Sequence, residues 1–181
     1  TIDSHDGSSA ADQPCYLNGR QETYVRNVFY SDLLGVVTME IATPIMDETG
    51  AAAAVLVGMV DLAELTDIMT AGSRFYESEE TYLVNDMSLL VTETRYTEDL
   101  AMKVAIETEG VEACLTNQDS GFGLYNDYRE VGVIEGHLWI EERDLCILTE
   151  VDQSEAFASV IALRNTLFAI GVGLALIATL A

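Results

Sequence analysis

At residues 166–181 the chain reads TLFAIGVGLALIATLA, a segment without one charged side chain. A helix needs about 20 apolar residues to cross the hydrocarbon core of a bilayer, so this segment is slightly short of a full span. We interpret it as part of a transmembrane helix that is truncated where the sequence stops. Gly171 and Gly173 favour this interpretation, because glycine destabilises soluble helices but is common in membrane helices. The alternative is the buried C-terminal helix of a soluble domain.

The rest of the chain is strongly acidic. It carries 31 Asp and Glu residues against 8 Lys and Arg residues, which gives a net charge of −23. Binding to nucleic acid needs clustered Lys and Arg, so a nucleic-acid partner is excluded. The charge also disfavours a position flat on an anionic lipid surface. A region poor in Lys and Arg is expected outside the cytoplasm, with Arg164 and Asn165 as the interfacial anchor of the membrane segment.

The hydrophobic share of 49% is enough for a packed core and excludes wholesale disorder. The three cysteines have no CxxC spacing, so at most one disulfide forms and one thiol remains over. We interpret Cys114 and Cys146 as small apolar core residues. The chain begins at Thr1 without an initiator Met or a signal peptide, and its N-terminus is therefore expected to be trimmed.

Alternating and β-branched patterns predict strands, and capping patterns predict helices. Residues 51–60 are almost continuously apolar and are expected to form a buried strand. One helix is predicted to follow Asp61, and another to run from Asp152 into the membrane segment. The other predicted elements are a short helical turn at 14–19 capped by Gly19, helical pieces at 97–117 broken at Gly110, and strands at 23–30, 36–46, 81–85, 89–94, 122–128, 133–140 and 145–151.

One local pattern occurs twice. Val-Asp-x-x-Glu is found at residues 60–64 and again at 151–155, each time after a strand and before a predicted helix. The two copies lie further apart than the usual periods of repeat proteins, so we interpret them as two related subdomains, with chance as the alternative. Runs of strands that end in a helix predict an α+β fold, with antiparallel sheets and helices to one side.

Several segments together resemble a known family of sensors. YSDLLG (30–35), IATPIMDETG (41–50) and VLVGMVDL (55–62) are similar to the membrane-distal module of a double Cache sensor domain. The membrane-proximal module is resembled by ETYLVN (80–85) with LLVT (89–92), by residues 123–129 and 133–136, and by LCILTEVDQSEAF (145–157). The resemblance implies two PAS-like modules, at residues 1–70 (without its N-terminal part) and 71–155, followed by a juxtamembrane and transmembrane helix at 156–181.

The resemblance also implies a role. Such domains sense small molecules outside the cell for chemotaxis receptors, sensor histidine kinases or cyclic-dinucleotide enzymes, and they form homodimers through the receptor helices. A first membrane helix and a long stalk helix would precede this chain, and an output domain would follow Ala181. We therefore expect a sensor without catalytic activity of its own, held in the cell membrane with its sensor portion extracellular or periplasmic.

In amino-acid-binding members of the family the ligand contacts an Arg-x-Trp-aromatic stretch, a Tyr-x-Asp pair, and an Asp that ends the last distal strand. The resemblance places Tyr30 and Asp32 on the pair and Asp61 on the terminal Asp. The first stretch falls on residues 13–16, where only Tyr16 matches and the Arg is missing. The pocket is therefore expected to be net negative and to favour an amine-bearing ligand, because a free carboxylate would lack a partner.

Structural explanations compete with ligand contact at these positions. Asp61 together with Glu64 would make a capping box at the start of a helix, and Asp32 borders a turn. Asp152 repeats the pattern of Asp61 beside the membrane helix and is interpreted as a helix cap alone.

No catalytic or cofactor motif is present, since the sequence has no P-loop, HExxH or GxSxG pattern. No metal site is predicted either: neither histidine has a Cys or His at ligand spacing, and His137 is expected at or near the surface of a sheet. The acidic pairs at 79–80 and 141–142 are interpreted as solvated, with Ca²⁺ binding as the alternative. The rival functions are a membrane-anchored adhesion module without a small-molecule ligand and a membrane-anchored hydrolase.

The acidic surface has two explanations, adaptation to brine or a generic acidic extracytoplasmic domain. If the charge is an adaptation to brine, raising KCl from dilute buffer to molar concentration should raise the melting temperature markedly, because ions screen the repulsion between like charges. Thermal unfolding measured at both concentrations checks this prediction. A flat or falling melting temperature would leave the generic explanation.

Overall fold

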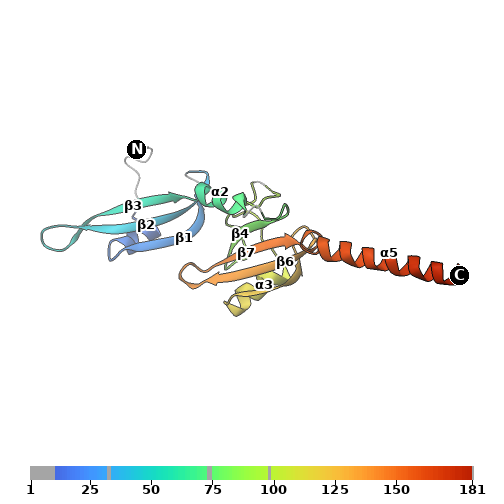
Figure 1. The fold of residues 1–181 in the computed structure, drawn as a ribbon. Helices are drawn as coiled ribbons and strands as arrows, with labels where there is room; N and C mark the ends of the chain where they lie inside the picture. The colour runs from blue at the N-terminus through green and yellow to red at the C-terminus, as the bar shows by residue number, and fades with distance from the viewer. Residues whose placement is uncertain (1–10, 32–33, 73–74, 98, 181) are drawn as a thin grey trace.

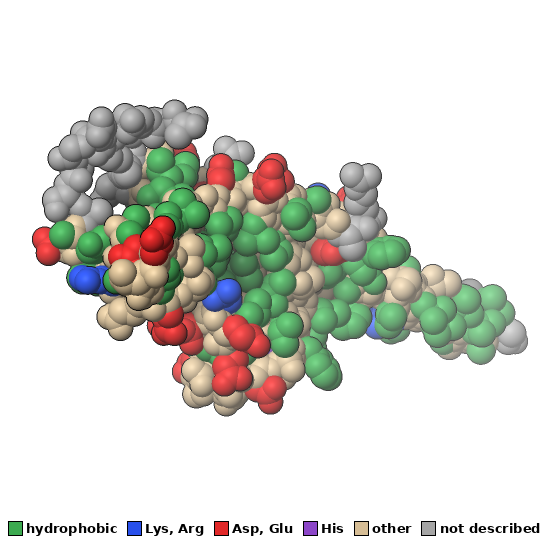
Figure 2. Space-filling view, turned by 90° about the vertical axis from the view of Figure 1, so that its left-hand side faces the viewer, with side chains coloured by type: hydrophobic (Ala, Val, Ile, Leu, Met, Phe, Trp, Pro, Cys, Tyr) green, Lys and Arg blue, Asp and Glu red, His purple; other side chains and the backbone are tan. Residues whose placement is uncertain are grey.

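The computed structural model describes residues 11–31, 34–72, 75–97 and 99–180. Two antiparallel sheets follow one another along the chain, and a long helix leaves the second sheet and points away from both (Figure 1). Seen from the end that carries the first sheet, the surface shows many acidic and few basic side chains around apolar ones (Figure 2). The predicted α+β class, with antiparallel sheets and a C-terminal apolar helix, is confirmed.

The first sheet is a meander of β1 (Tyr24–Ser31), β2 (Val36–Met46) and β3 (Ala52–Asp61), in that spatial order. The helix α1 (Pro14–Gly19) precedes it, and α2 (Ala63–Ala71) follows it. Gly19 is buried against β2, where an added Cβ would lie 2.5 Å from the Cβ of Ala42. The predicted capping role of Gly19 is therefore wrong: the close packing of α1 on the sheet is what requires glycine there.

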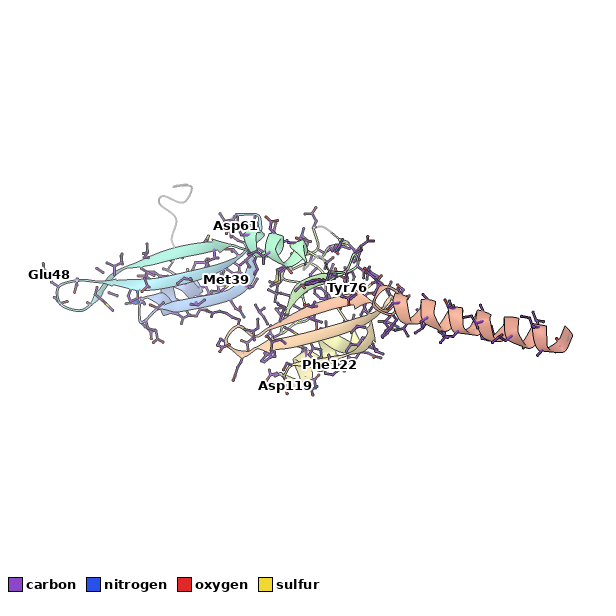
Figure 3. The ribbon with its side chains drawn as sticks, in the orientation of Figure 1. Met39, Glu48, Asp61, Tyr76, Asp119 and Phe122 are labelled. Atoms are coloured by element: carbon purple, nitrogen blue, oxygen red, sulfur yellow. A yellow bond between two sulfur atoms is a disulfide. The ribbon has the colours of Figure 1, made fainter. Side chains whose placement is uncertain are left out.

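The third strand forms where it was predicted, but it is not buried. Nearly all its residues are exposed, Leu56 and Met59 among them. β3 is an edge strand that pairs only with β2, and the helix that packs on this sheet, α1, has only six residues. The β2–β3 turn carries Glu48 to the tip of a long hairpin, at the far end from Asp61 (Figure 3). An apolar run therefore predicted the strand but not its burial.

The second sheet has the spatial order β4 (Glu80–Asn85), β7 (Leu145–Asp152), β6 (Gly132–Ile140) and β5 (Gly121–Asn126). The helix α3 (Glu109–Asn117) packs on β5, β6 and β7, and the 3-10 turn η1 (Glu141–Arg143) joins β6 to β7. The main core of the second sheet contains eight buried residues: Tyr82, Val84, Leu90, Ile106, Val111, Cys114, Cys146 and Leu148.

Two predictions for the chain between β4 and β5 are wrong. The strand expected at 89–94 is reduced to isolated bridges at Leu89 and Leu90. The helix expected at 97–117 begins only at Glu109, and Gly110 lies inside it instead of breaking it. Helical propensity in this region is overridden by tertiary packing, because Gly110 is needed where α3 crosses a buried side chain of β6.

The chain leaves the second sheet through α4 (Gln153–Ala156) and then α5 (Ala158–Leu180). Within α5, the span Ala158–Thr179 (22 residues) contains an 18-residue window with a mean hydropathy of 2.0 that the rest of the described chain does not bury. At 1.5 Å per residue this helix is about 33 Å long, enough for a hydrocarbon core of about 30 Å. By length and composition α5 can cross a membrane, and the alternative of a buried C-terminal helix is wrong.

Cys114 on α3 and Cys146 on β7 form a disulfide, with their Cα atoms 6.4 Å apart. Cys15 is a buried free thiol. The expectation of at most one disulfide and one remaining thiol is confirmed, and Cys114 and Cys146 lie in the core as predicted; their pairing was not predicted. Only the packing of α3 across β7 brings two cysteines 32 positions apart into bonding range. Disulfides persist in oxidising compartments, in agreement with a position outside the cytoplasm.

Removing the disulfide should destabilise the protein by about 2–4 kcal/mol, because the cross-link restricts the unfolded chain. The variant is Cys114→Ser/Cys146→Ser, and its free energy of unfolding is measured by denaturant titration. Cys15→Ser is the matched control: a reducing agent should lower the stability of the parent and of this control, and leave the double variant unchanged. A reductant effect of equal size in all three proteins would contradict the assignment.

Candidate functional site

A cleft of about 370 Å³ lies where the end of the first sheet and the start of α2 meet the chain after β4. Tyr30 of β1 and Asp61 of β3 both line it, and Leu62 and Val91 are apolar lining residues. The cleft therefore brings together two of the four residues predicted to contact a ligand. Its other polar and charged lining residues are Thr66, Asp67, Glu93, Asp99 and Lys103.

Asp61 is the last residue of β3 and stands at the junction with α2 (Figure 3). Its Oδ1 accepts a hydrogen bond from the backbone N–H of Ala63 at 2.9 Å. The helix starts one residue later than predicted, with Leu62 in the capping position, so the expected capping box with Glu64 is not formed. The carboxylate still satisfies one free N–H of the first turn. Its exposed position at the cleft leaves it accessible to a ligand as well.

The other predicted residues have different outcomes. Tyr30 is 41% exposed, and its hydroxyl lies beside Gly35, which has a φ of +68° in the turn after β1. Tyr16 does not line the cleft; it lies on α1, with the guanidinium of Arg20 5.9 Å from the centre of its ring. Asp32 lies outside the described residues. The predicted set is thus divided, and only Tyr30 and Asp61 share a cavity.

The charges around the cleft are mostly negative. Four carboxylates (Asp61, Asp67, Glu93 and Asp99) face one ammonium group, that of Lys103. Glu93 is also structural, since its oxygens accept the backbone N–H groups of Leu100 and Ala101 at 3.0 and 3.3 Å. A positively charged group is therefore the complementary ligand chemistry for this cavity.

A second group of polar side chains lies inside the second sheet. Glu80, Glu150 and Glu135 occupy one row across the neighbouring strands β4, β7 and β6, because Glu150 is the register partner of both others. All three carboxylates are at most 1% exposed. Glu79 is buried as well, so the interpretation of residues 79–80 as a solvated pair is wrong, whereas the pair at 141–142 is exposed as predicted.

Each glutamate of this row has one or two partners. The hydroxyl of Tyr82 donates to Glu150 Oε1 at 2.6 Å, and the hydroxyl of Tyr128 donates to Glu80 Oε2 at 3.0 Å. His137 is buried, contrary to prediction, and its Nδ1 lies 3.1 Å from Glu135 Oε1. Burial raises the pKa of all three carboxyl groups, and that of Glu150 to about 8.

Arg129 connects this region to the start of α4. Its guanidinium pairs with Asp127 in the β5–β6 turn and, at 2.7 Å, with Asp152 at the end of β7. It also stacks over the ring of Tyr96, 3.9 Å from its centre. Asp152 occupies the N-cap position of α4, as interpreted from the sequence, but its side chain makes no capping bond and pairs with Arg129 instead.

Solved structures similar to this chain include sensor domains of membrane receptors. The extracellular domain of mmHK1S-Z3, which is described as a histidine kinase, matches with a TM-score of 0.63 and 19% identity, over 90% of this chain and 60% of that one. The periplasmic sensory domain of the Campylobacter jejuni chemoreceptor Tlp1 also has a TM-score of 0.63, with 13% identity over 81% and 57% of the two chains. The ligand-binding domain of the Pseudomonas aeruginosa amino acid chemoreceptor PctB, solved with L-Arg, has a TM-score of 0.58 and 17% identity, over 87% and 67%.

The fold is that of a Cache-type sensor domain. No protein-family profile and no curated protein matches the sequence. The chain spans about 60% of the length of the mmHK1S-Z3 domain. At these identities the likeness is one of fold, and the ligand has to be argued from the side chains.

Sequence reasoning missed part of each site in this Cache-type fold. Glu93, Asp99 and Lys103 line the cleft but lie more than 30 positions beyond Asp61, and no local pattern links them to it. The row of glutamates is visible in the sequence pattern: Glu135 and Glu150 lie in predicted strands and Glu80 directly before one, each two positions from, and so on the same face as, His137, Leu148 and Tyr82 respectively. A charged residue in phase with the core face is a candidate for a buried functional group.

Glu150 should make the stability of this protein depend on pH. Its pKa is about 8 in the folded protein, and its ordinary value is 4.5. The stability that it contributes is therefore fully present below about pH 4.5 and is lost as the pH rises through about 8. Burial raises this pKa most, and the nearby carboxylates of Glu135, Glu80 and Asp127 raise it further, whereas the hydrogen bond from Tyr82 lowers it. In chelator-containing buffer the melting temperature should fall between about pH 5 and pH 8, and Glu150→Gln should reduce this fall.

The matched control is Glu142→Gln, which removes an exposed carboxylate on η1 and should leave the parent's pH profile unchanged. Glutamine keeps an acceptor for Tyr82, so Glu150→Gln should still fold. Identical melting profiles for the parent and Glu150→Gln would contradict the assignment.

Proposed function

We propose that the chain is the extracytoplasmic ligand-sensing part of a membrane-bound signal-transduction receptor. Three features support this function: the Cache-type fold, the disulfide between Cys114 and Cys146, and a C-terminal helix that can cross a membrane. The receptor would act as a homodimer, with an output domain of the chemotaxis, histidine kinase or cyclic-dinucleotide type on the other side of the membrane. The similar structures are ligand-binding domains and not catalytic ones.

In this proposal residues 1–70 form the membrane-distal module and residues 71–155 the membrane-proximal one, with 156–181 as the juxtamembrane and transmembrane helix. The order of the elements supports these bounds, because each sheet is followed by its own helix and only the second continues into α5. The second sheet would then stand next to the membrane, with the first beyond it (Figure 1).

One observation carries the proposed ligand site: Tyr30 and Asp61 line one cleft whose charges are mostly negative. We propose an amine-bearing ligand that pairs with Asp61 and contacts the phenol of Tyr30, with Asp32 as a further contact; Tyr16 lies outside this cleft. PctB was solved with L-Arg and Mlp24 with asparagine, so small molecules with an amino group are ligands of similar structures. A ligand with only a carboxylate would find one cation, Lys103, against four acidic groups.

The same cleft supports a route for the signal. Its lining comes from the first sheet, from α2 and from residues of the chain after β4, among them Val91, Glu93 and Lys103, so a bound ligand would contact both halves of the molecule. A ligand that prefers one arrangement of these parts shifts the population towards it. The change would pass through the second sheet to β7, which leads into α4 and α5.

Asp61→Asn should abolish binding of the amine ligand while changing the stability by less than about 1 kcal/mol, because Asn caps a helix start nearly as well as Asp. The ligand is first found by a thermal-shift screen of amines, amino acids, carboxylates and purines, since a ligand of the folded state raises the melting temperature. Affinities are then measured by calorimetry. A loss of at least about 10-fold is expected for the variant.

Asp119→Asn is the control for net charge, because Asp119 is exposed at the opposite side of the molecule (Figure 3). This variant should bind like the parent. If Asp61→Asn also binds the identified ligand like the parent, Asp61 serves only to satisfy the N–H group of Ala63. If a free carboxylate without an amine is the best ligand in the screen, the proposed ligand class is wrong.

A further inference from the structure

The buried glutamates of the second sheet pose a problem that the proposed function does not solve. Glu80 and Glu150 are direct partners across β4 and β7, and Glu150 is in turn the direct partner of Glu135 on β6. Like charges on directly opposite positions destabilise a sheet. These three are also removed from water, where an unpaired carboxylate costs several kcal/mol. Something must neutralise them.

The described side chains do not supply enough positive charge. Glu135 has His137 as its partner, and Arg129 pairs with Asp127 and Asp152. Among the described residues no salt bridge reaches Glu80 or Glu150. One oxygen of each glutamate, Glu80 Oε1, Glu135 Oε2 and Glu150 Oε2, is buried without a hydrogen-bond partner. Buried polar atoms without a partner are rare in folded proteins and point to a missing ion, water or proton.

Glu80 and Glu150, which each have a free oxygen, lie close to the carboxylate of Asp127, whose oxygens already accept hydrogen bonds from Arg129 and Val131. One carboxylate oxygen from each of Glu80, Asp127 and Glu150 lies within 4.8 Å of the other two. Calcium binds oxygen at 2.3–2.6 Å, so two ligands on opposite sides of the ion are about 4.8 Å apart. The three residues come from β4, from the β5–β6 turn and from β7, and their side chains are at most 4% exposed. Three elements are thus brought together around one point.

The donor set selects the kind of ion. All three ligands are carboxylate oxygens, without sulfur or nitrogen, which suits hard cations such as Ca²⁺ and Mg²⁺ and not zinc. Mg²⁺ needs a near-ideal octahedron at 2.0–2.1 Å and usually keeps several waters. Calcium tolerates irregular geometry, and it fits a site whose positions are set by strand register.

A cavity of about 480 Å³ lies beside the cluster. Of the three carboxylates, Asp127 lines this cavity, and so does Tyr128, whose hydroxyl donates to Glu80. Further lining residues are Glu107, Glu109 and Glu130, so the mouth is acidic. Such a mouth raises the local concentration of cations next to Asp127.

We propose that Glu80, Glu150 and Asp127 bind a divalent cation, Ca²⁺ being the ion that fits. The site is separate from the ligand cleft at Tyr30 and Asp61. The bound ion would hold β4, β7 and the β5–β6 turn together. One of its ligands, Asp127, is also paired with Arg129, which in turn pairs with Asp152 at the start of α4. It would neutralise Glu80 and Glu150, while Glu135 keeps His137.

The test uses the whole chain in detergent, freed of metal with a chelator and held in concentrated KCl to screen the surface charge. Calorimetry with CaCl₂ should show one Ca²⁺ per chain, and Ca²⁺ should raise the melting temperature. In Glu80→Gln/Glu150→Gln the affinity should fall by at least about 100-fold. This variant should be as stable as the metal-free parent or more so, because two like charges have been removed. Glu141→Gln/Glu142→Gln makes the same change in net charge at exposed positions and should keep the parent's affinity.

A second measurement needs no variant. Tb³⁺ bound in place of Ca²⁺ should luminesce when tyrosine is excited, because Tyr82 and Tyr128 are bonded to the ligand carboxylates, and Ca²⁺ should quench this emission. The proposal is overturned if the metal-free parent takes up no Ca²⁺ at millimolar concentration, if the emission is not displaced by Ca²⁺, or if Glu80→Gln/Glu150→Gln binds like the parent. Equal losses in both double variants would also overturn it, because they would assign the binding to surface charge.

Discussion

The burial of acidic groups in the second sheet is the constraint on which most of this half of the structure depends. Glu80, Glu135 and Glu150 share one face of the sheet with its apolar core, and the surrounding residues are those that such groups require. Tyr82 and Tyr128 direct their hydroxyls at the carboxylates, and His137 faces Glu135. Some of the many acidic residues of this protein are therefore buried in its core, where each carboxylate requires a hydrogen-bonding neighbour.

The position of α3 follows from the same constraint. A Cβ on Gly110 would lie 1.9 Å from an oxygen of Glu135, so only glycine lets the helix approach the sheet at this point. That approach also brings Cys114 within reach of Cys146. The sequence suggested a helix break at Gly110 and did not predict the pairing of the two cysteines, because glycine and cysteine patterns carry no information about which distant strand a helix will cross. Both differences have one cause, which is a contact between α3 and strands that follow it in the chain.

Local patterns predicted much of the rest. The bounds of β2 match the prediction, and those of β3, β6 and β7 agree to within one residue at each end, because β-branched runs closed by turn residues define strands well. Burial was harder to predict: β3 is apolar yet exposed, and Glu80 is charged yet buried, since both depend on what packs against the strand. Only part of the cleft's lining could be predicted from the sequence. Tyr30 and Asp61 belong to recognisable motifs, but Asp99 and Lys103 reach the cleft only through the tertiary fold.

The scarcity of lysine has a practical consequence for work on this molecule. The sequence contains one lysine, and the structure places it in the lining of the cleft. Once the α-amino group is blocked, an amine-reactive dye can therefore attach at a single position, Lys103. A fluorophore there would sit beside the residues proposed to hold the ligand, and its emission could follow occupancy without any introduced cysteine that might disturb the native disulfide. The single lysine thus provides one defined position for chemical labelling, next to the proposed ligand site.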